Sequence, residues 1–249
     1  MSSPAGRLTA RLLFATLAIG VAAREVAGWQ EIPPGKVTDK ERTLVVEVHR
    51  ARKNYQESLE RLRGYYVRSK NDEQRYWAER EMTQYHMMVK DPYILDLDLP
   101  DANLRPDKNI PQANNILRDA IEHLNKPTLM ETDKNQHRAE VLLRRLINDY
   151  PQSDKVDEAC YYLGEIYSSK YFEQYRRAVA FYERCLQYEP DTRMPARLKA
   201  AIVYEKNLAD WGRAKELYQE IMQKQIEPGQ TKEAGRRLEK LLGARRPAR

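Results

Sequence analysis

The apolar positions of residues 38–90 recur with steps of three and four, the spacing of one face of a long helix. Thr38 and Glu41 have the spacing of a capping box, so we expect the first helix to begin there. A second helix should follow Asn71 and end before Pro92. The pattern therefore predicts a long helical hairpin. Its apolar stripe comprises Leu44, Val48, Ala51, Tyr55, Leu59, Leu62, Tyr66, Ala78, Met82, Tyr85 and Val89.

Two helices alone cannot bury a stripe of this width. The hairpin must therefore pack either on the helices that follow it or on a second copy of the chain. The pattern leaves both alternatives open, and the second of them predicts a homo-oligomer.

Residues 91–111 interrupt the helical pattern, because proline and aspartate are frequent there. We expect a loop that joins the hairpin to the later helices. Asp96, Asp98 and Asp101 have the first spacings of a calcium-binding loop, but the glycine at its sixth position and its closing Glu are missing. We therefore expect no calcium site.

From residue 112 onward, one pattern of large and small residues recurs. Gly164 lies inside a predicted helix, where glycine costs about 1 kcal/mol relative to alanine. We expect a closely approaching helix to offset this cost, with Ala178 and Cys185 facing the glycine. The tyrosines of the pattern should lie in the core. The recurring positions are Ala139, Leu143, Leu146, Pro151, Leu163, Gly164, Tyr167, Ala178, Tyr182, Cys185, Pro190, Ala200, Ala201, Tyr204, Ala214, Tyr218 and Ile221.

The composition favours an all-α fold. Only 10 of the 249 residues are glycine, which leaves little material for phosphate-binding loops or tight sheet turns. We expect residues 112–243 to form a helical array that ends in a capping helix near Thr231–Leu242. The residues of this helix that should face inward are Leu238, Leu241 and Leu242.

Residues 157–192 match the tetratricopeptide repeat (TPR) at its leucine, glycine, tyrosine, alanine, aromatic, small and proline positions. The chain therefore resembles this repeat family, whose helix pairs stack into an α-solenoid that binds other proteins. The sequence departs from the family at Cys160, where the family has tryptophan, and by two extra residues before Ala178. The resemblance implies an N-terminal hairpin followed by a TPR-like α-solenoid.

Residues 149–155 and the helix after them look like the envelope branch of these repeat proteins. That branch includes the β-barrel-assembly lipoproteins of the outer membrane and the Tol-Pal coordinator proteins of Gram-negative bacteria. The coordinator type fits better, because the lipoprotein type needs an amino-terminal Cys that is absent here. The resemblance implies a protein-binding scaffold without catalytic activity.

Partner contact is expected on the concave side of the array, at first-helix positions between the packing residues. A groove of mixed apolar and acidic character suits a helix or an extended segment with basic flanks. The predicted groove residues are Tyr161, Glu165, Ser168, Leu198, Ile202 and Glu205.

The formal charge of +6 comes mostly from cations interleaved with acids at helical spacing, which is typical of solvated helix faces. Basic residues are concentrated only near the carboxyl end, which includes a basic tail at residues 244–249. No aromatic residues interleave with them, so we expect no nucleic-acid partner. An anionic envelope surface would attract this tail.

Residues 1–28 have the anatomy of a secretory signal peptide, because Arg7 and Arg11 precede an apolar run at residues 12–23. A helix of that length rises about 18 Å, well short of the hydrocarbon core of a bilayer. Cleavage is expected after Ala23 or Gly28, before a linker at residues 29–37. This interpretation predicts an exported protein that is periplasmic or envelope-associated, and the alternative is an ordinary apolar helix.

We find no signature of catalysis, metal binding or cofactor binding. His49, His86, His123 and His137 lie on separate predicted helices, without a second ligand at the spacing a metal needs. No Gly-rich phosphate loop and no nucleophile motif is present. The sequence therefore predicts neither an enzyme nor a cofactor.

Cys160 and Cys185 lie on the two helices of one predicted repeat, at levels that face each other. Export would allow them to form a disulfide. The alternative is a pair of small buried hydrophobic residues.

The sequence favours an exported, non-catalytic scaffold of the cell envelope that binds protein partners in the groove of its repeats. The alternative is a structural oligomer assembled through the coiled-coil-like hairpin.

Overall fold

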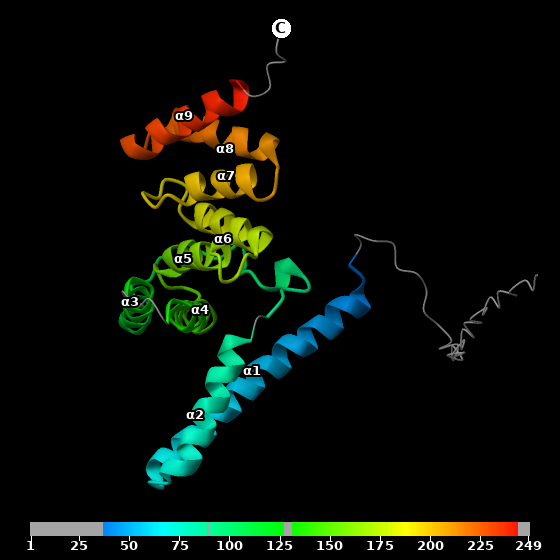
Figure 1. The fold of residues 1–249 in the computed structure, drawn as a ribbon, viewed down its shortest axis with the longest axis vertical. Helices are drawn as coiled ribbons and strands as arrows, with labels where there is room; N and C mark the ends of the chain where they lie inside the picture. Colours follow the sequence, from blue (N-terminus) through cyan, green and yellow to red (C-terminus); the bar gives the residue numbers. More distant parts are fainter. Residues whose placement is uncertain (1–36, 89, 127–130, 244–249) are drawn as a thin grey trace, which may run out of the picture. The chain divides into compact units, whose positions relative to one another are not determined.

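The computed structural model describes residues 37–88, 90–126 and 131–243. These residues contain nine α-helices, one 3₁₀ turn (η1, Leu95–Leu97) and no strand, which confirms the all-α fold (Figure 1). The predicted signal segment, residues 29–36 of the linker, Val89 and the basic tail lie outside the described residues. The helices are α1 (Asp39–Arg68), α2 (Asp72–Met87), α3 (Pro111–Asn125), α4 (Thr132–Asp149), α5 (Val156–Ser168), α6 (Tyr175–Tyr188), α7 (Ala196–Lys206), α8 (Trp211–Lys224) and α9 (Pro228–Gly243).

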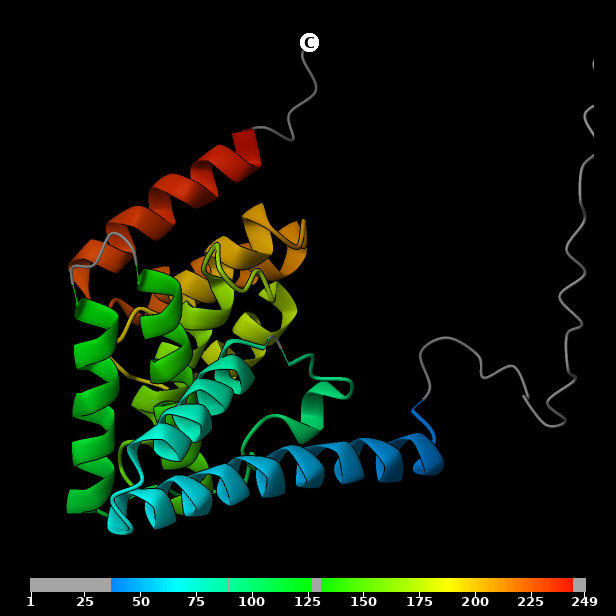
Figure 2. The same ribbon diagram turned by 60° about the horizontal axis from the view of Figure 1, so that its bottom comes forward.

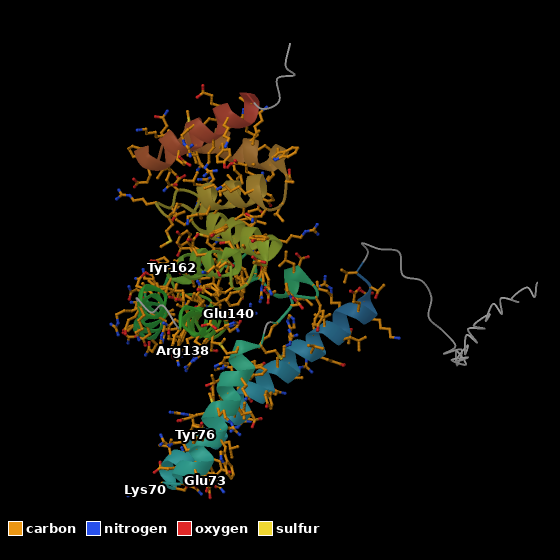
Figure 3. All side chains as sticks on the ribbon, in the orientation of Figure 1. Lys70, Glu73, Tyr76, Arg138, Glu140 and Tyr162 are labelled. Atoms are coloured by element: carbon orange, nitrogen blue, oxygen red, sulfur yellow. The ribbon has the colours of Figure 1, made fainter. Side chains whose placement is uncertain are left out.

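Helices α1 and α2 pack against each other as a hairpin (Figure 1). The hydroxyl oxygen of Thr38 accepts a hydrogen bond from the backbone N–H of Glu41 at 3.1 Å and caps α1. Asn71 caps α2 in the same way, through the backbone N–H of Gln74. Lys70, labelled in Figure 3, lies in the turn between the two helices, and Glu73 lies in the first turn of α2.

The hairpin buries only part of its predicted stripe. Leu59 and Ala78 are buried, but much of the stripe on α1 is exposed to solvent, because neither α2 nor the later helices cover it. The exposed apolar side chains of α1 include Leu44, Val48, Tyr55, Leu62 and Tyr65, with exposed fractions from 38% to 59%.

Helices α3 to α9 each pack against the next helix along the chain, as Figures 1 and 2 show. Their buried residues form one continuous hydrophobic core, which includes the fully buried side chains of Leu143, Leu163, Tyr167 and Tyr182. This core has the residue types expected from the recurring pattern. Its buried alanines let successive helices approach closely. Ala139, Ala178, Ala200, Ala201 and Ala214 are all completely buried.

Gly164 lies at one close approach, but its neighbour differs from the expected one. A Cβ atom at this position would lie 2.6 Å from Cδ1 and Cε1 of Tyr182. The three nearest atoms all belong to that ring rather than to Ala178 or Cys185. The flat face of an aromatic side chain therefore occupies the space that the missing side chain leaves.

The capping helix α9 begins at Pro228, three residues before the expected start near Thr231, and one of its three expected inward-facing residues differs from the prediction. Leu238 and Leu241 are partly buried and pack against the core. Leu242 is 46% exposed and does not face inward, because α9 has no further helix beside it among the described residues.

Candidate functional site

A series of tyrosine–glutamate hydrogen bonds joins five consecutive helices. In each case the phenolic O–H on one helix donates to a carboxylate on the preceding helix. The distances are 2.8 Å for Tyr167 to Glu140, 3.1 Å for Tyr204 to Glu183 and 2.6 Å for Tyr218 to Glu205, and Tyr182 donates to Glu165. We call these four pairs the tyrosine–glutamate series. They cross every junction from α4 to α8.

The tyrosines of this series are core residues with one polar end. Tyr167, Tyr182 and Tyr218 are completely buried, which confirms their predicted place in the core, and Tyr204 is half-buried. A buried hydroxyl without a hydrogen-bond partner would destabilise the fold. The carboxylates accept from these hydroxyls and so allow the tyrosine rings to pack in the core. Burial, together with Glu183, raises the pKa of Tyr204 to about 12. These hydroxyls therefore stay protonated donors at neutral pH.

Each of three glutamates in the series also binds a cation from the helix after next. Glu165 of α5 pairs with Lys199 of α7 at 2.7 Å. In the same way Arg213 of α8 lies 3.2 Å from Glu183 of α6, and Arg237 of α9 lies 3.1 Å from Glu205 of α7. Each of these three carboxylates thus contacts side chains on the next two helices. These contacts fix the position of each helix relative to the two that follow it.

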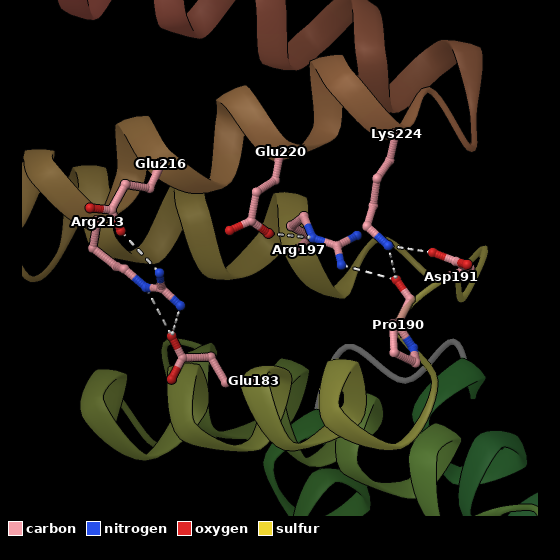
Figure 4. Close-up of polar contacts among 8 residues, drawn as sticks. All are labelled: Glu183, Pro190, Asp191, Arg197, Arg213, Glu216, Glu220 and Lys224. Carbon is pink, nitrogen blue, oxygen red and sulfur yellow. Dashed lines mark hydrogen bonds and ion pairs between the residues drawn. The ribbon is translucent and has the colours of Figure 1, made fainter.

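Figure 4 shows the middle of this arrangement. Arg213 reaches Glu183 on α6 and also pairs with Glu216 on its own helix at 3.0 Å. Nearby, Arg197 donates to Glu220 and to the carbonyl oxygen of Pro190, which closes the turn between α6 and α7. The later helices are therefore joined by polar contacts as well as by the core.

A buried salt bridge between Asp98 and Arg177 lies beside the first pair of the tyrosine–glutamate series. The sequence did not predict it. The Arg177 guanidinium donates to both carboxylate oxygens of Asp98, through Nε at 2.6 Å and Nη2 at 3.0 Å. Both side chains are only 4% exposed. Arg144 of α4 lies 2.8 Å from the same carboxylate. Asp98, which we considered as part of a calcium loop, instead fastens residues 95–98 to α4 and α6.

The guanidinium of Arg177 also lies 3.8 Å from the centre of the Tyr167 ring. The first pair of the series, Glu140 and Tyr167, is therefore in contact with the Asp98 salt bridge. Burial alone would raise the pKa of the Asp98 carboxyl, but Arg144 and Arg177 outweigh it and hold that pKa below its usual value. Glu140 behaves similarly: burial opposes its charge, and the His137 ring, Arg144 and Arg177 lower its pKa.

The predicted groove residues fall into two groups. Tyr161, Glu165 and Ser168 of α5 surround one ring: Tyr161 lies 6.0 Å from the Tyr182 ring, and the Ser168 hydroxyl lies 3.3 Å from the Tyr182 hydroxyl. The others lie on α7, where Glu205 belongs to the tyrosine–glutamate series.

Two apolar groove residues on α7 differ in exposure. Leu198 is buried in the core, whereas Ile202 is half-buried beside it. The carboxylates of Glu165 and Glu205 are already engaged inside the protein. The surface chemistry that remains for a partner is therefore mainly that of Tyr161 and Ile202.

Cys160 and Cys185 are both buried and are free thiols in the structure. Burial, followed by the neighbouring Cys185, raises the pKa of the Cys160 thiol. Burial raises the pKa of Cys185 to about 12. Both groups therefore behave as small apolar side chains at neutral pH.

No family model, no curated protein and no solved structure gives a significant match to this chain. The geometry of the described residues is therefore the basis for assigning a function. Among those residues, no cluster of three or more His, Cys, Asp or Glu could hold a metal ion. None of the helices in this part of the chain has the length and apolar character that crossing a bilayer requires.

A signal for the tyrosine–glutamate series was present in the sequence. Tyr182 directly precedes Glu183, and Tyr204 directly precedes Glu205. In each dipeptide the tyrosine bonds backward to the preceding helix and the glutamate accepts from the following one. A Tyr–Glu dipeptide at equivalent positions of successive helices is the pattern that could have predicted it.

Proposed function

We propose that this protein is an exported, non-catalytic scaffold of the cell envelope whose helices α3 to α9 form a TPR-like α-solenoid that binds a protein partner. One observation carries the proposal: α3 to α9 each pack on the next helix, and a repeated polar link spans three helices at a time. Arrays built from such nearest-neighbour contacts present long, continuous surfaces to other proteins.

The tyrosine–glutamate series supports a binding function because it makes the surface rigid before a partner arrives. Binding then costs little ordering of the scaffold. Tyr161 and Ile202, which lie on α5 and α7, are half-buried and offer aromatic and aliphatic contact area beside the engaged carboxylates of Glu165 and Glu205. A partner segment with apolar side chains suits this surface.

The experiment is photocrosslinking in the organism of origin, with a photoreactive residue at position 161 or 202. Matched controls carry the same photoreactive residue at Gln187 of α6 or Gln219 of α8. Both positions are exposed, and both lie on helices other than α5 and α7. We expect one and the same protein to be trapped from positions 161 and 202 and from neither control. Equal trapping from all four positions, or none from positions 161 and 202, would contradict the proposal.

A second candidate is a structural oligomer assembled through the hairpin, and a specific observation favours it. Leu44, Val48, Leu62 and Tyr65 share one side of α1 at heptad-like spacing, and all are exposed. A row of this kind on an otherwise solvated helix is typical of an interface.

Sedimentation of the full chain over a range of concentrations tests this candidate. Leu62→Glu should shift the protein toward the monomer. Leu242→Glu is the control, because Leu242 on α9 is similarly exposed and should leave the distribution unchanged. A parent chain that stays monomeric at every concentration would exclude the oligomer.

A further inference from the structure

A cavity of about 940 Å³ lies between α1, residues 97–100 and α4. Its wall includes seven Lys or Arg side chains and five Asp or Glu side chains. This volume is within the range of sites that enclose small molecules, roughly 300–1,000 Å³. The six predicted groove residues are not part of it, so the cavity is separate from the surface proposed for the protein partner.

Three of the five acidic side chains of the cavity have partners inside the protein that bear on the proposal. Asp98 is held by Arg144 and Arg177. Asp149 pairs with Arg145 at 3.3 Å. Glu140 accepts a hydrogen bond from Tyr167. Over the whole wall, seven cations face five carboxylates, so an excess of positive charge remains.

Lys90 is the most informative of those cations. Its ammonium group is partly buried and donates to the carbonyl oxygens of Tyr85 and Met88 at 2.9 and 3.1 Å. It also lies 4.5 Å from the centre of the Tyr85 ring. Within residues 37–88, 90–126 and 131–243, no carboxylate forms an ion pair with it. A partly buried ammonium with only neutral hydrogen-bond partners is incompletely compensated.

Arg52 likewise has only neutral contacts. Its guanidinium donates to the carbonyl oxygen of Asp91 at 3.4 Å and lies 5.4 Å from the Tyr93 ring. Among the described carboxylates, none forms an ion pair with it. Burial lowers the pKa of Lys90, and Arg52, Arg144 and Arg177 lower it further against the opposing effect of Glu140. The cavity thus brings several cations together with an excess of positive charge.

We propose that this cavity binds a ligand that carries a phosphate group, with Lys90 and Arg52 contacting the phosphate oxygens. Phosphate suits the site because a guanidinium donates two parallel hydrogen bonds to it and an ammonium adds a compact charge. An anion of this kind would supply the negative charge that the protein's own carboxylates leave unprovided. The phosphate could belong to a soluble molecule or to a lipid headgroup, and the same cations would recognise both.

The test measures binding by the full chain in two parallel arms. Calorimetric titration with inorganic pyrophosphate probes the soluble source. Flotation with phosphatidylglycerol vesicles, compared with phosphatidylcholine vesicles, probes the headgroup. Lys90→Met and Arg52→Gln should each weaken binding by about tenfold or more, because each removes a charge-assisted contact.

Lys170→Met is the matched control. Lys170 also lies against a tyrosine ring, 5.0 Å from that of Tyr171, but it is exposed and outside the cavity. Binding in either arm that falls with Lys90→Met and Arg52→Gln but not with Lys170→Met supports the site and identifies its source. The proposal is overturned when neither arm shows binding, or when a folded Lys90→Met or Arg52→Gln variant binds like the parent chain.

Two variants keep the test independent of folding. Lys90 also holds two carbonyl oxygens of the hairpin end, so its variant is checked by circular dichroism. Arg52 makes one long hydrogen bond, so its replacement by Gln leaves the hairpin intact. Undiminished binding by a folded Arg52→Gln variant alone is enough to reject the proposed contact.

Discussion

The phenolic oxygen of Tyr218 lies 2.6 Å from Oε2 of Glu205, and Arg237 of α9 donates to the same oxygen at 3.1 Å. Tyr218 is completely buried, and the Glu205 side chain is 19% exposed. One carboxylate therefore satisfies a buried hydroxyl and a neighbouring guanidinium at once. Glu165 and Glu183 each make the same two kinds of contact, one with a tyrosine hydroxyl and one with a cation, so the arrangement recurs along the helices.

Replacing Tyr218 by Phe should lower the free energy of unfolding by about 1 kcal/mol, because the ring stays packed while one hydrogen bond is lost. Glu205→Gln should cost more, since it also removes the charge opposite Arg237. A double-mutant cycle in urea should show that the two changes are not additive, because both act on one contact. Strict additivity would show that the charge of Glu205 does not strengthen this hydrogen bond, because the side-chain oxygen of a glutamine can still accept from Tyr218.

Asp98→Asn should destabilise the protein by about 3 kcal/mol, because it leaves the buried Arg177 without its counter-charge. Urea unfolding measures the loss. Asp96→Asn is the control, since Asp96 lies two residues away and is exposed, and it should change the free energy of unfolding very little. Equal effects of the two substitutions would contradict the importance of the salt bridge.

Acid should destabilise the fold through Asp98 and Glu140. Both carboxyls have a pKa below its ordinary value in the folded protein, where Arg144 and Arg177 favour their charged forms against the opposing effect of burial. The unfolded chain then binds more protons, so their contribution is complete above about pH 5 and is lost as the pH falls below about 4. Urea unfolding across this range should show the decline, and Asp98→Asn should flatten it. A slope unchanged by that substitution would assign the acid sensitivity to other groups.

Gly164→Ala should cost about 3 kcal/mol or prevent folding. The added Cβ would lie 2.6 Å from the Tyr182 ring, which is fully buried and whose hydroxyl contacts Glu165 and Ser168, so the ring can shift only at a cost. Gly229→Ala on α9 is the control, because no atom lies within 4 Å of a Cβ there. It should be neutral or stabilise the helix by up to about 1 kcal/mol. Thermal unfolding of the two variants compares them directly, and similar melting temperatures would refute the close contact at Gly164.

Neither cysteine should react with a thiol reagent in the folded protein at mildly alkaline pH. Burial raises the pKa of both thiols, to about 12 for Cys185, so little reactive thiolate forms. In guanidinium chloride both should react, which a colorimetric thiol count measures. A chain purified without reductant that yields no thiol on unfolding would instead contain the disulfide between Cys160 and Cys185.

The sequence predicted the helices well, because the core positions repeat along the chain. Tyr167, Tyr182 and Tyr218 could be placed in the interior because they share the phase of buried alanines and leucines. Their carboxylate partners carried a weaker signal, because Tyr–Glu dipeptides mark Glu183 and Glu205 but not Glu140 or Glu165. A glutamate beside a core residue looks like any solvated one in a chain with 37 Asp and Glu residues.

The salt bridge of Asp98 was still harder to predict from the sequence than the tyrosine–glutamate pairs. It lies in a stretch that predicts a loop, and its partner Arg177 is 79 residues away along the chain. No local pattern specifies a contact at that separation. The exposed row on α1 shows the opposite case: steps of three and four predict the helix, but periodicity alone does not tell which partner, if any, covers a helix face.

The carboxylates that reach from one helix to the helix after next have a consequence for how the array can vary in length. An array held together only between adjacent helices could gain or lose a terminal pair with little effect on the rest. Here the removal of α9 would strip Glu205 of Arg237, and a shortened chain would expose an unmatched charge two helices inward. Truncation after α8 therefore changes the surroundings of a carboxylate two helices inward, the same one that accepts from the buried Tyr218 hydroxyl.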